Sequence, residues 1–261
     1  MDVGILSYGL YVPRRRLQRN SIYQTNRWYA PGLGGLAKGE KAISNWDEDP
    51  VTMAVEAGRY CMDGIDRGLV ESISLASTTL PFADRSNAGI VKEALNLSDN
   101  VMSADCTGSL RAGTSSLMHA LQNSAMAPCL AADRRKSKVA STEEMNYGDA
   151  SAAVLAGSGE VIAKYLGGYS KSIDFVDHYR ETGADFDYAW EARFVRDEGY
   201  QKILGSAIGA ALEKLGISAA AVDHAVISVP VRGVPQKLAA VAGIAPEAVA
   251  DSHMATVGDT G

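Results

Sequence analysis

The chain has 261 residues, of which 46% are hydrophobic and 21% charged, and its formal net charge at pH 7 is −6. This composition is typical of a soluble globular protein with one large domain or about two ordinary ones. The acidic balance does not favour nucleic acid as a partner. The three cysteines, Cys61, Cys106 and Cys129, have no paired spacing. They argue against a disulfide framework and a cysteine-rich zinc site, and fit a reducing cytoplasm.

The sequence predicts neither a signal peptide nor a membrane span. Its first basic residues follow the apolar stretch at residues 3–11 instead of preceding it, and Gly4 and Gly9 interrupt that stretch. No run approaches about 18 apolar residues, the length that a spanning helix needs. We therefore expect a cytoplasmic protein.

Strands and helices are predicted to alternate along the first part of the chain. The expected elements are a strand at 3–11, a helix at 18–27, a long glycine-rich loop at 29–49, a helix at 51–64, a strand at 72–79 and a helix at 86–95. Strands are expected at 129–133 and 147–156, and residues 161–168 are expected to pair with the second of these after a turn at 157–159. This alternation favours an α/β fold.

The later part of the chain has a different pattern. We expect a charged and aromatic insertion at 175–200, a helix with one apolar face at 201–215, a strand at 225–229 and a helix at 235–242. Four basic residues gather at 134–138, and their favoured interpretation is a solvated loop. The alternative is a patch for the phosphates of an anionic ligand.

The stretch at 101–121 carries the first chemical candidate. A strand-like run ends at Asp105-Cys106, and the next residues turn into a helix. A cysteine at such a joint lies beside the free N–H groups and the positive end of a helix, which lower the pKa of a thiol. Cys106 is therefore a candidate nucleophile. The alternative is a small buried residue that packs the joint between strand and helix.

Several segments together resemble the thiolase superfamily, most closely the hydroxymethylglutaryl-CoA synthase and ketoacyl-ACP synthase III branch. They are GILSYGLYVPRRRL near the start, GLAKGEKAISNWDEDPVTMAVEAG, the turn from Cys106 to Gly113, YGDASAAVLAG, and DFVDHYRETGADFDYAWEARF. The resemblance implies a five-layer αβαβα fold of two similar α/β halves, of which the second is incomplete here. Residues 1–168 would form the N-terminal half. Residues 169–261 would form an insertion and part of the C-terminal half.

The resemblance also implies an acyltransferase chemistry. In this family a cysteine takes an acyl group from a thioester, and a histidine assists attack by the carbanion of a second acyl thioester. A glutamate or an asparagine completes the site. The substrate would be acyl-CoA or acyl-ACP, with no other cofactor, and the protein would act in lipid metabolism. A homodimer is implied, and a small OB-fold and zinc-ribbon protein or a second thiolase is a possible partner.

Three positions depart from the family pattern. By the resemblance, Thr78 (or Thr79) stands where the family has its glutamate, Ser228 where it has its histidine, and Asp259 where it has its asparagine. An aspartate lacks the amide N–H donors of asparagine and would repel an enolate. We keep these three as candidate substrate-binding residues. His253 is the one plausible replacement base.

Two registers are possible for the nucleophile itself. A register on Cys106-Thr107-Gly108 makes Cys106 the nucleophile, and the 27 residues from Cys106 to Asp133 agree with it. A register on Arg111-Ala112-Gly113 places Leu110 there instead. The two positions differ by about one helical turn, or 5–6 Å.

Two functions therefore stay open. The first is a C–C bond-forming condensing enzyme with Cys106 as acyl acceptor, with a thioesterase-like hydrolase as a variant of it. The second is a non-catalytic thiolase-fold subunit that binds acyl-CoA or scaffolds an acyl-CoA-processing complex.

Overall fold

The computed structural model describes all residues from Met1 to Gly261. The chain divides into two compact units. The first contains Met1–Arg135, Val139–Tyr165 and Ala255–Gly261, and the second contains Lys136–Lys138 and Leu166–Met254. No helix in either unit has both the length and the apolar character that crossing a bilayer requires. The predicted division into two family halves at residue 168 stays a prediction, because the two compact units are separated by their contacts and not by their similarity to family halves.

The first unit is built on a six-stranded sheet with the strand order β5-β4-β6-β7-β1-β8. Strand β4 pairs in parallel with β5 and β6, whereas β7 is antiparallel to both β6 and β1. The strands are β1 (Asp2–Tyr11), β4 (Ser72–Ala76), β5 (Met102–Cys106), β6 (Ala127–Asp133), β7 (Ala150–Gly159) and β8 (Ala163–Lys164). A sheet with parallel strands connected by helices confirms the predicted α/β class.

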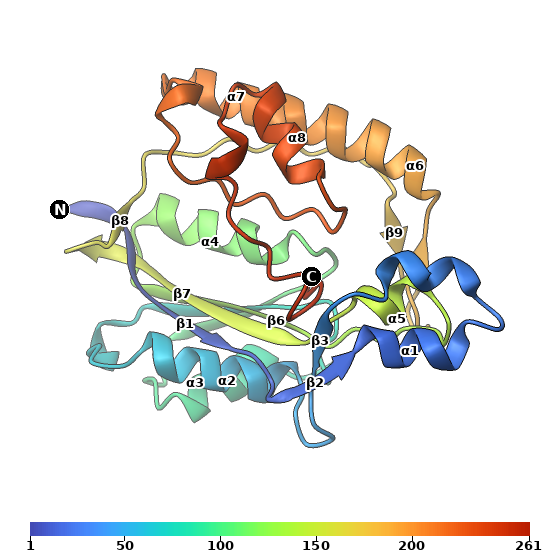
Figure 1. Cartoon of the computed structure of the whole chain (residues 1–261). Coiled ribbons are helices and arrows are strands. Elements are labelled where there is room, and N and C mark those ends of the chain that lie inside the picture. The colour runs from blue at the N-terminus through green and yellow to red at the C-terminus, as the bar shows by residue number, and fades with distance from the viewer. The chain divides into compact units, whose positions relative to one another are not determined.

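Helices cover both faces of this sheet. Helices α2 (Pro50–Cys61) and α3 (Asn87–Ala94) lie on one face, and α4 (Ala112–Asn123) lies on the other (Figure 1). A capping box fixes the start of α2, because Asp49 Oδ1 accepts from the Thr52 amide and Thr52 Oγ1 accepts from the Asp49 amide, both at 2.8 Å.

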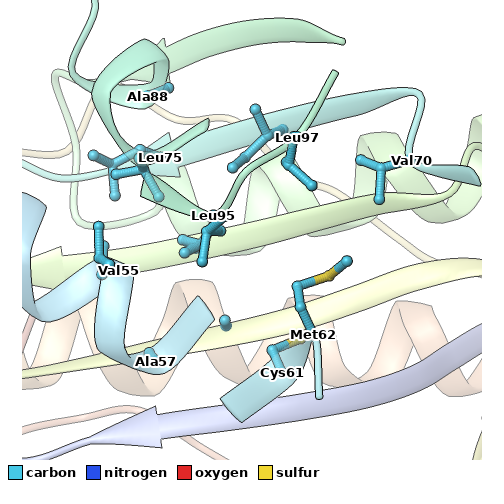
Figure 2. Packing of buried hydrophobic residues seen from close by; sticks show 14 of the residues in the cluster. Val55, Ala57, Cys61, Met62, Val70, Leu75, Ala88, Leu95 and Leu97 are labelled. Atoms are coloured by element: carbon cyan, nitrogen blue, oxygen red, sulfur yellow. The ribbon is translucent and has the colours of Figure 1, made fainter. Parts of the chain in front are cut away.

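The main core lies between α2, α3 and the sheet. Val55, Leu75 and Leu95 belong to this cluster (Figure 2), and Leu75 and Leu95 are almost completely buried. Gly9 on β1 lets α2 come close, because a Cβ there would lie 2.1 Å from the Ala57 carbonyl oxygen. This packing fixes the positions of the strands whose ends form the site described below.

A smaller subdomain of the first unit surrounds a two-stranded sheet. Its elements are β2 (Arg15–Gln18), β3 (Glu40–Ile43), α1 (Arg19–Asn26), α5 (Thr142–Asn146) and a 3-10 helix (Pro31–Leu36). Ile22, Leu33 and Met145 form its core. The last residues of the chain join it, because the amides of Glu40 and Ala42 donate to the carbonyls of Ala255 and Val257 at 2.9 and 2.8 Å.

The second unit contains a short hairpin and a long helical segment. The hairpin pairs β9 (His178–Tyr179) with β10 (Tyr188–Ala189). The segment begins with α6 (Ala192–Phe194), continues as a π-helix (Val195–Leu204) and ends with α7 (Gly205–Leu215). Helix α8 (Val234–Val241) packs on it through Val234 and Leu238. Short 3-10 helices lie at Arg67–Leu69 in the first unit and at Ala219–Ala221 and Pro246–Ala248 in the second.

The structure confirms most of the predicted elements and corrects three of them. Residues 29–49 are not one loop, since they contain the 3-10 helix and β3. Residues 157–159 are not a turn, because β7 runs through them and β8 pairs with β1. Residues 225–229 form no strand. Only Ala225 pairs there, in a single bridge to Val249.

Candidate active site at the strand ends

Three parallel strands end at the same edge of the large sheet. Strand β4 ends at Ala76, β5 at Cys106 and β6 at Asp133. Ala76 lies opposite both Cys106 and Ala131, so the three ends are neighbours. Ligands of α/β proteins bind outside the carboxyl ends of parallel strands. The side chains at and after these three ends therefore form the candidate site.

Cys106 is the last residue of β5. The carboxylate of the preceding Asp105 accepts from the Asn87 and Ala88 amides at 2.9 and 2.6 Å, where α3 begins. Successive side chains of a strand point to opposite faces, so the Cys106 side chain lies on the α4 face. Cys106 is partly exposed, whereas Cys61 and Cys129 are buried. It is the cysteine that a reagent can reach.

The thiol of Cys106 does not lie in the environment that the sequence predicted. Helix α4 begins at Ala112, six residues further on. Burial raises the pKa of Cys106, a hydrogen bond with Ser116 lowers it, and the charge of Asp105 raises it. The net direction is upward. The expectation of a lowered thiol pKa is therefore wrong, because burial outweighs the hydrogen bond from α4.

Leu110 lies in this turn, two residues before α4. A Cβ built on Gly261 would lie 3.2 Å from Leu110 Cδ2 and 3.0 Å from Asp133 Oδ2, so these three residues meet at the strand ends. The two sequence registers thus place the nucleophile at two positions on the same side of the sheet. One is Cys106 at the end of β5, and the other is Leu110 just before α4.

Asp133 organises the loop after β4. Its Oδ1 accepts from the Thr78 amide at 2.9 Å, from Thr78 Oγ1 at 3.0 Å, from Thr79 Oγ1 at 2.7 Å and from Ser77 Oγ at 3.1 Å. Hydrogen bonds to a carboxylate are stronger than those between neutral groups. Asp133 therefore holds Thr78, which the sequence resemblance predicts at the family's glutamate position, at the ends of β4 and β6.

Asp259 is paired with a buried arginine. Arg135 Nη2 lies 2.8 Å from Asp259 Oδ2 and donates to the Asp259 carbonyl at 3.1 Å. The guanidinium also lies over the Tyr147 ring, 3.7 Å from its centroid. The Arg135 side chain is only 3% exposed. Burial disfavours its charged form, but the charge of Asp259 outweighs this, and the pKa of Arg135 is raised.

Backbone contacts fix the segment that carries Asp259. The Gly148 amide donates to the Asp259 carbonyl at 2.9 Å, and the Asp259 amide donates to the Asn146 carbonyl at 2.8 Å. Gly148 is needed for this approach, since a Cβ there would lie 2.0 Å from the Val257 carbonyl oxygen. The segment that carries Asp259 is thus held by main-chain hydrogen bonds as well as by Arg135.

The structure brings three of the five predicted site residues into one unit. Cys106, Thr78 and Asp259 all belong to the first unit, around the ends of β4, β5 and β6. Ser228 and His253 belong to the second unit and are exposed there. His253 has a left-handed backbone with φ of 55°, and its Nδ1 lies 3.8 Å from Asp251 Oδ2.

Asp133 and Arg135 also lie at these strand ends, although the sequence did not predict them as site residues. The signal was available, because Asp133 ends the buried strand at 127–133 and Arg135 lies two residues beyond it, in the place where parallel strands end. The favoured interpretation of the basic segment 134–138 as a solvated loop is wrong for Arg135, which is buried in an ion pair. Arg134, Lys136 and Lys138 are exposed.

We use the name strand-end cluster for Thr78, Cys106, Asp133, Arg135 and Asp259. The cluster contains one accessible thiol, two carboxylates and one buried guanidinium. No group of three or more His, Cys, Asp or Glu side chains is placed to hold a metal ion. The arrangement offers a thiol for nucleophilic chemistry at the end of β5, and fixed charges and hydroxyl groups around the ends of β4 and β6.

Solved structures share the fold of this chain. The 3-oxoacyl-(acyl carrier protein) synthase III, FabH, from Pseudomonas aeruginosa PAO1 matches all of the chain over 86% of its own length, with a TM-score of 0.84 and 16% identity. The structure of MvaS in complex with 3-hydroxy-3-methylglutaryl coenzyme A matches 82% of the chain over 53% of its own length, with a TM-score of 0.68 and 19% identity. These matches confirm the predicted thiolase-like fold.

The sequence itself identifies the family. A comparison with protein-family models gives no match. The hydroxymethylglutaryl-CoA synthase of Methanosarcina acetivorans is 31% identical over 253 residues, which are 93% of this chain and 72% of that protein. On this similarity the chain belongs to the hydroxymethylglutaryl-CoA synthase family.

Proposed function

We propose that the protein is an acyltransferase that condenses acyl thioesters, with Cys106 as the acyl acceptor. Membership of the hydroxymethylglutaryl-CoA synthase family supports the class of reaction. The observation that carries the residue assignment is the position of Cys106 at the carboxyl ends of β4, β5 and β6, as the only cysteine that is not buried.

The proposed first step is transfer of an acyl group to sulfur. The Cys106 thiolate attacks the carbonyl carbon of the thioester, and the new C–S bond replaces the bond to the CoA sulfur. CoA leaves as a thiolate and takes up the proton that the cysteine has lost. In the second step another acyl thioester loses an α-proton, and its carbanion attacks the carbonyl carbon of the acyl-enzyme. A C–C bond forms, the C–S bond to Cys106 breaks, and the released Cys106 thiolate takes up a proton, so the enzyme returns to its starting state.

The environment of Cys106 predicts the pH dependence of acylation. Because the pKa of the thiol is raised, the protonated and unreactive form dominates at neutral pH. We expect the acylation rate to rise with pH until the thiol has titrated. The hydrogen bond with Ser116 stabilises the thiolate, so Ser116→Ala is expected to move this rise to higher pH.

The substrate and assembly are part of the same proposal. We propose acyl-CoA as the donor. The similar MvaS structure, which contains 3-hydroxy-3-methylglutaryl coenzyme A, supports this choice. We also propose a homodimer, which sedimentation of the purified protein tests.

Intact-mass spectrometry tests the proposed function. The protein is incubated with a panel of acyl-CoAs, and we expect a mass increase of one acyl group that peptide mapping assigns to Cys106. Cys106→Ser must abolish the adduct. Cys129→Ser must retain it, because Cys129 is buried. A protein that binds acyl-CoA in equilibrium dialysis and forms no adduct at saturation would be a non-catalytic subunit, contrary to the proposal.

A further inference from the structure

The hydroxyl groups of Ser74 and Ser116 connect the large sheet to helix α4 beside Cys106. Their Oγ atoms lie 2.5 Å apart, and either can be the donor. Ser74 lies opposite Ala104 on β5 and Cys129 on β6. Cys106 lies two residues beyond Ala104, and side chains two residues apart on a strand point to the same face. The side chains of Ser74, Cys106 and Cys129 therefore share the face that α4 covers.

Helix α4 packs closely enough for Ser116 to reach this face. Gly113 lies three residues before Ser116, and a Cβ there would be 3.3 Å from Ala131 Cβ on β6. Residues three apart on a helix lie on the same side of it. The Ser116 hydroxyl consequently bonds with the Cys106 thiol as well as with Ser74.

The number of hydrogens sets the direction of these bonds once Cys106 is ionised. A hydroxyl group has one hydrogen to donate, and its oxygen can accept others. A thiolate only accepts, so the hydrogen of Ser116 must point to the Cys106 sulfur. The bond between the two serines must then be donated by Ser74. When Cys106 is protonated, the same positions allow the opposite direction, in which Ser116 donates to Ser74.

Cys129 does not take this hydrogen, although both serines interact with its sulfur. Its side chain is buried whereas Cys106 is partly exposed, and burial disfavours a thiolate, so Cys106 ionises first. The Cys129 thiol stays a donor, and the Ala127 carbonyl lies 3.8 Å from its sulfur as an acceptor. The hydrogen of Ser116 is therefore left for Cys106.

We propose that Ser74 is a positioning residue that donates to Ser116 and so directs the Ser116 hydrogen to the sulfur of Cys106 as the thiolate forms. Ser74 acts through Ser116 and is not assigned contact with the substrate. The catalytic meaning of this inference rests on the proposed function, whereas the direction of the hydrogen bonds can be tested on the thiol alone.

The titratable groups on the elements packed around Cys106 stay in place in every variant of the test. Asp105 caps the start of α3, and its charge acts on the thiol. Arg111 and His119 are exposed. Strand β4 contains no titratable residue. The complete set is Asp105 on β5, Cys129 and Asp133 on β6, Arg111 and His119 at α4, and Lys92 and Glu93 on α3.

The test measures how fast iodoacetamide alkylates Cys106 at each pH in Ser74→Ala, Ser116→Ala and the double variant, by mass spectrometry. Below the midpoint of the profile, Ser116→Ala should slow alkylation about tenfold, because the thiolate loses a charge-assisted hydrogen bond. Ser74→Ala should slow it by a smaller factor, about threefold, because Ser116 keeps its hydrogen but loses the donor that directs it. The double variant should equal Ser116→Ala.

This equality distinguishes positioning from structural support. If Ser74 only supports the packing of α4, Ser74→Ala slows alkylation by the same factor whether or not Ser116 has its hydroxyl. Ser74→Thr keeps the hydroxyl and should stay near wild type. Ser151→Ala is the matched control, because Ser151 on β7 makes a buried hydrogen bond to the Met53 carbonyl of α2, on the other face of the sheet.

The same variants are then incubated with the panel of acyl-CoAs. Slower acylation in Ser74→Ala, with the double variant equal to Ser116→Ala, supports the inference together with the proposed function. If the wild-type protein is never acylated but the alkylation rates follow the predicted order, the proposed function fails and the positioning by Ser74 stands. The inference is overturned if folded Ser74→Ala is alkylated like wild type at every pH. It is also overturned if the effect of Ser74→Ala is the same in the Ser116→Ala background.

Discussion

Substitution of Gly148 by alanine is expected to release the segment that carries Asp259. The added Cβ would lie 2.0 Å from the Val257 carbonyl oxygen, about 1.4 Å closer than an ordinary van der Waals contact. Two backbone atoms cannot move apart as a flexible side chain can. The segment at 255–261 must therefore shift away from Gly148.

The magnitude follows from the contacts that this shift breaks. The hydrogen bond from the Gly148 amide to the Asp259 carbonyl breaks, and so does the hydrogen bond from the Asp259 amide to the Asn146 carbonyl. Each such bond contributes about 1 kcal/mol net, and the buried ion pair with Arg135 is strained or lost as well. We expect the free energy that holds residues 255–261 in place to fall by about 2–4 kcal/mol. The loss cannot exceed the free energy that docks the segment, since the sheet persists without it.

Hydrogen exchange is the assay, because it measures the protection of each backbone amide in the segment separately. The amides of Asp259 and Gly148 should lose protection in Gly148→Ala, while those of β4 and β6 keep it. Gly35→Ala is the matched control, since a Cβ at Gly35 meets nothing within 4 Å. Wild-type protection at Asp259 in a folded Gly148→Ala protein would refute this account of the turn.

Two further predictions concern the hydrogen bonds around the site and at the edge of the fold. Asp133→Ala removes the acceptor for the Thr78 amide and three hydroxyl groups, so we expect the free energy of unfolding in urea to fall by about 2–4 kcal/mol. Asp133→Asn keeps an oxygen there and should lose about half as much, and equal losses would contradict the assignment. The hydrogen bond to Glu48 raises the pKa of Tyr11 to about 12 from an ordinary value of 10.0. Its contribution to stability is therefore complete below pH 10 and is lost as the pH rises toward 12, and ultraviolet titration should show Glu48→Gln returning Tyr11 toward its ordinary pKa.

The sequence predicted the layers of the first unit because its signals are local. Alternating apolar residues, the Asp49 cap and the short connections each act within a few residues, and they specify β1, α2 and the β5–α4 joint. The pairing of β8 with β1 and the hydrogen bonds of residues 255–259 to β3 and Gly148 depend on contacts between distant parts of the chain. No local pattern encodes these contacts.

The candidate site divides in the same way. Cys106 and Thr78 follow strands, and their places can be predicted from the chain order of the strands. Asp259 was expected to repel an anion, because the sequence does not show that Arg135, 124 residues earlier, is buried against it. The expected lowering of the Cys106 pKa was wrong for a related reason. Burial of the thiol raises its pKa, and burial depends on the packing of α4 against β5, which the local sequence does not show.

Acylation of Cys106 is the measurement that tests the central claim most directly. The protein is incubated with saturating acyl-CoA at several pH values, quenched in acid, and analysed by intact-mass spectrometry and peptide mapping. The account predicts one acyl group on Cys106, formed faster as the pH rises and absent in Cys106→Ser. An unmodified Cys106 at every pH, in a protein that binds the acyl-CoA, would contradict it.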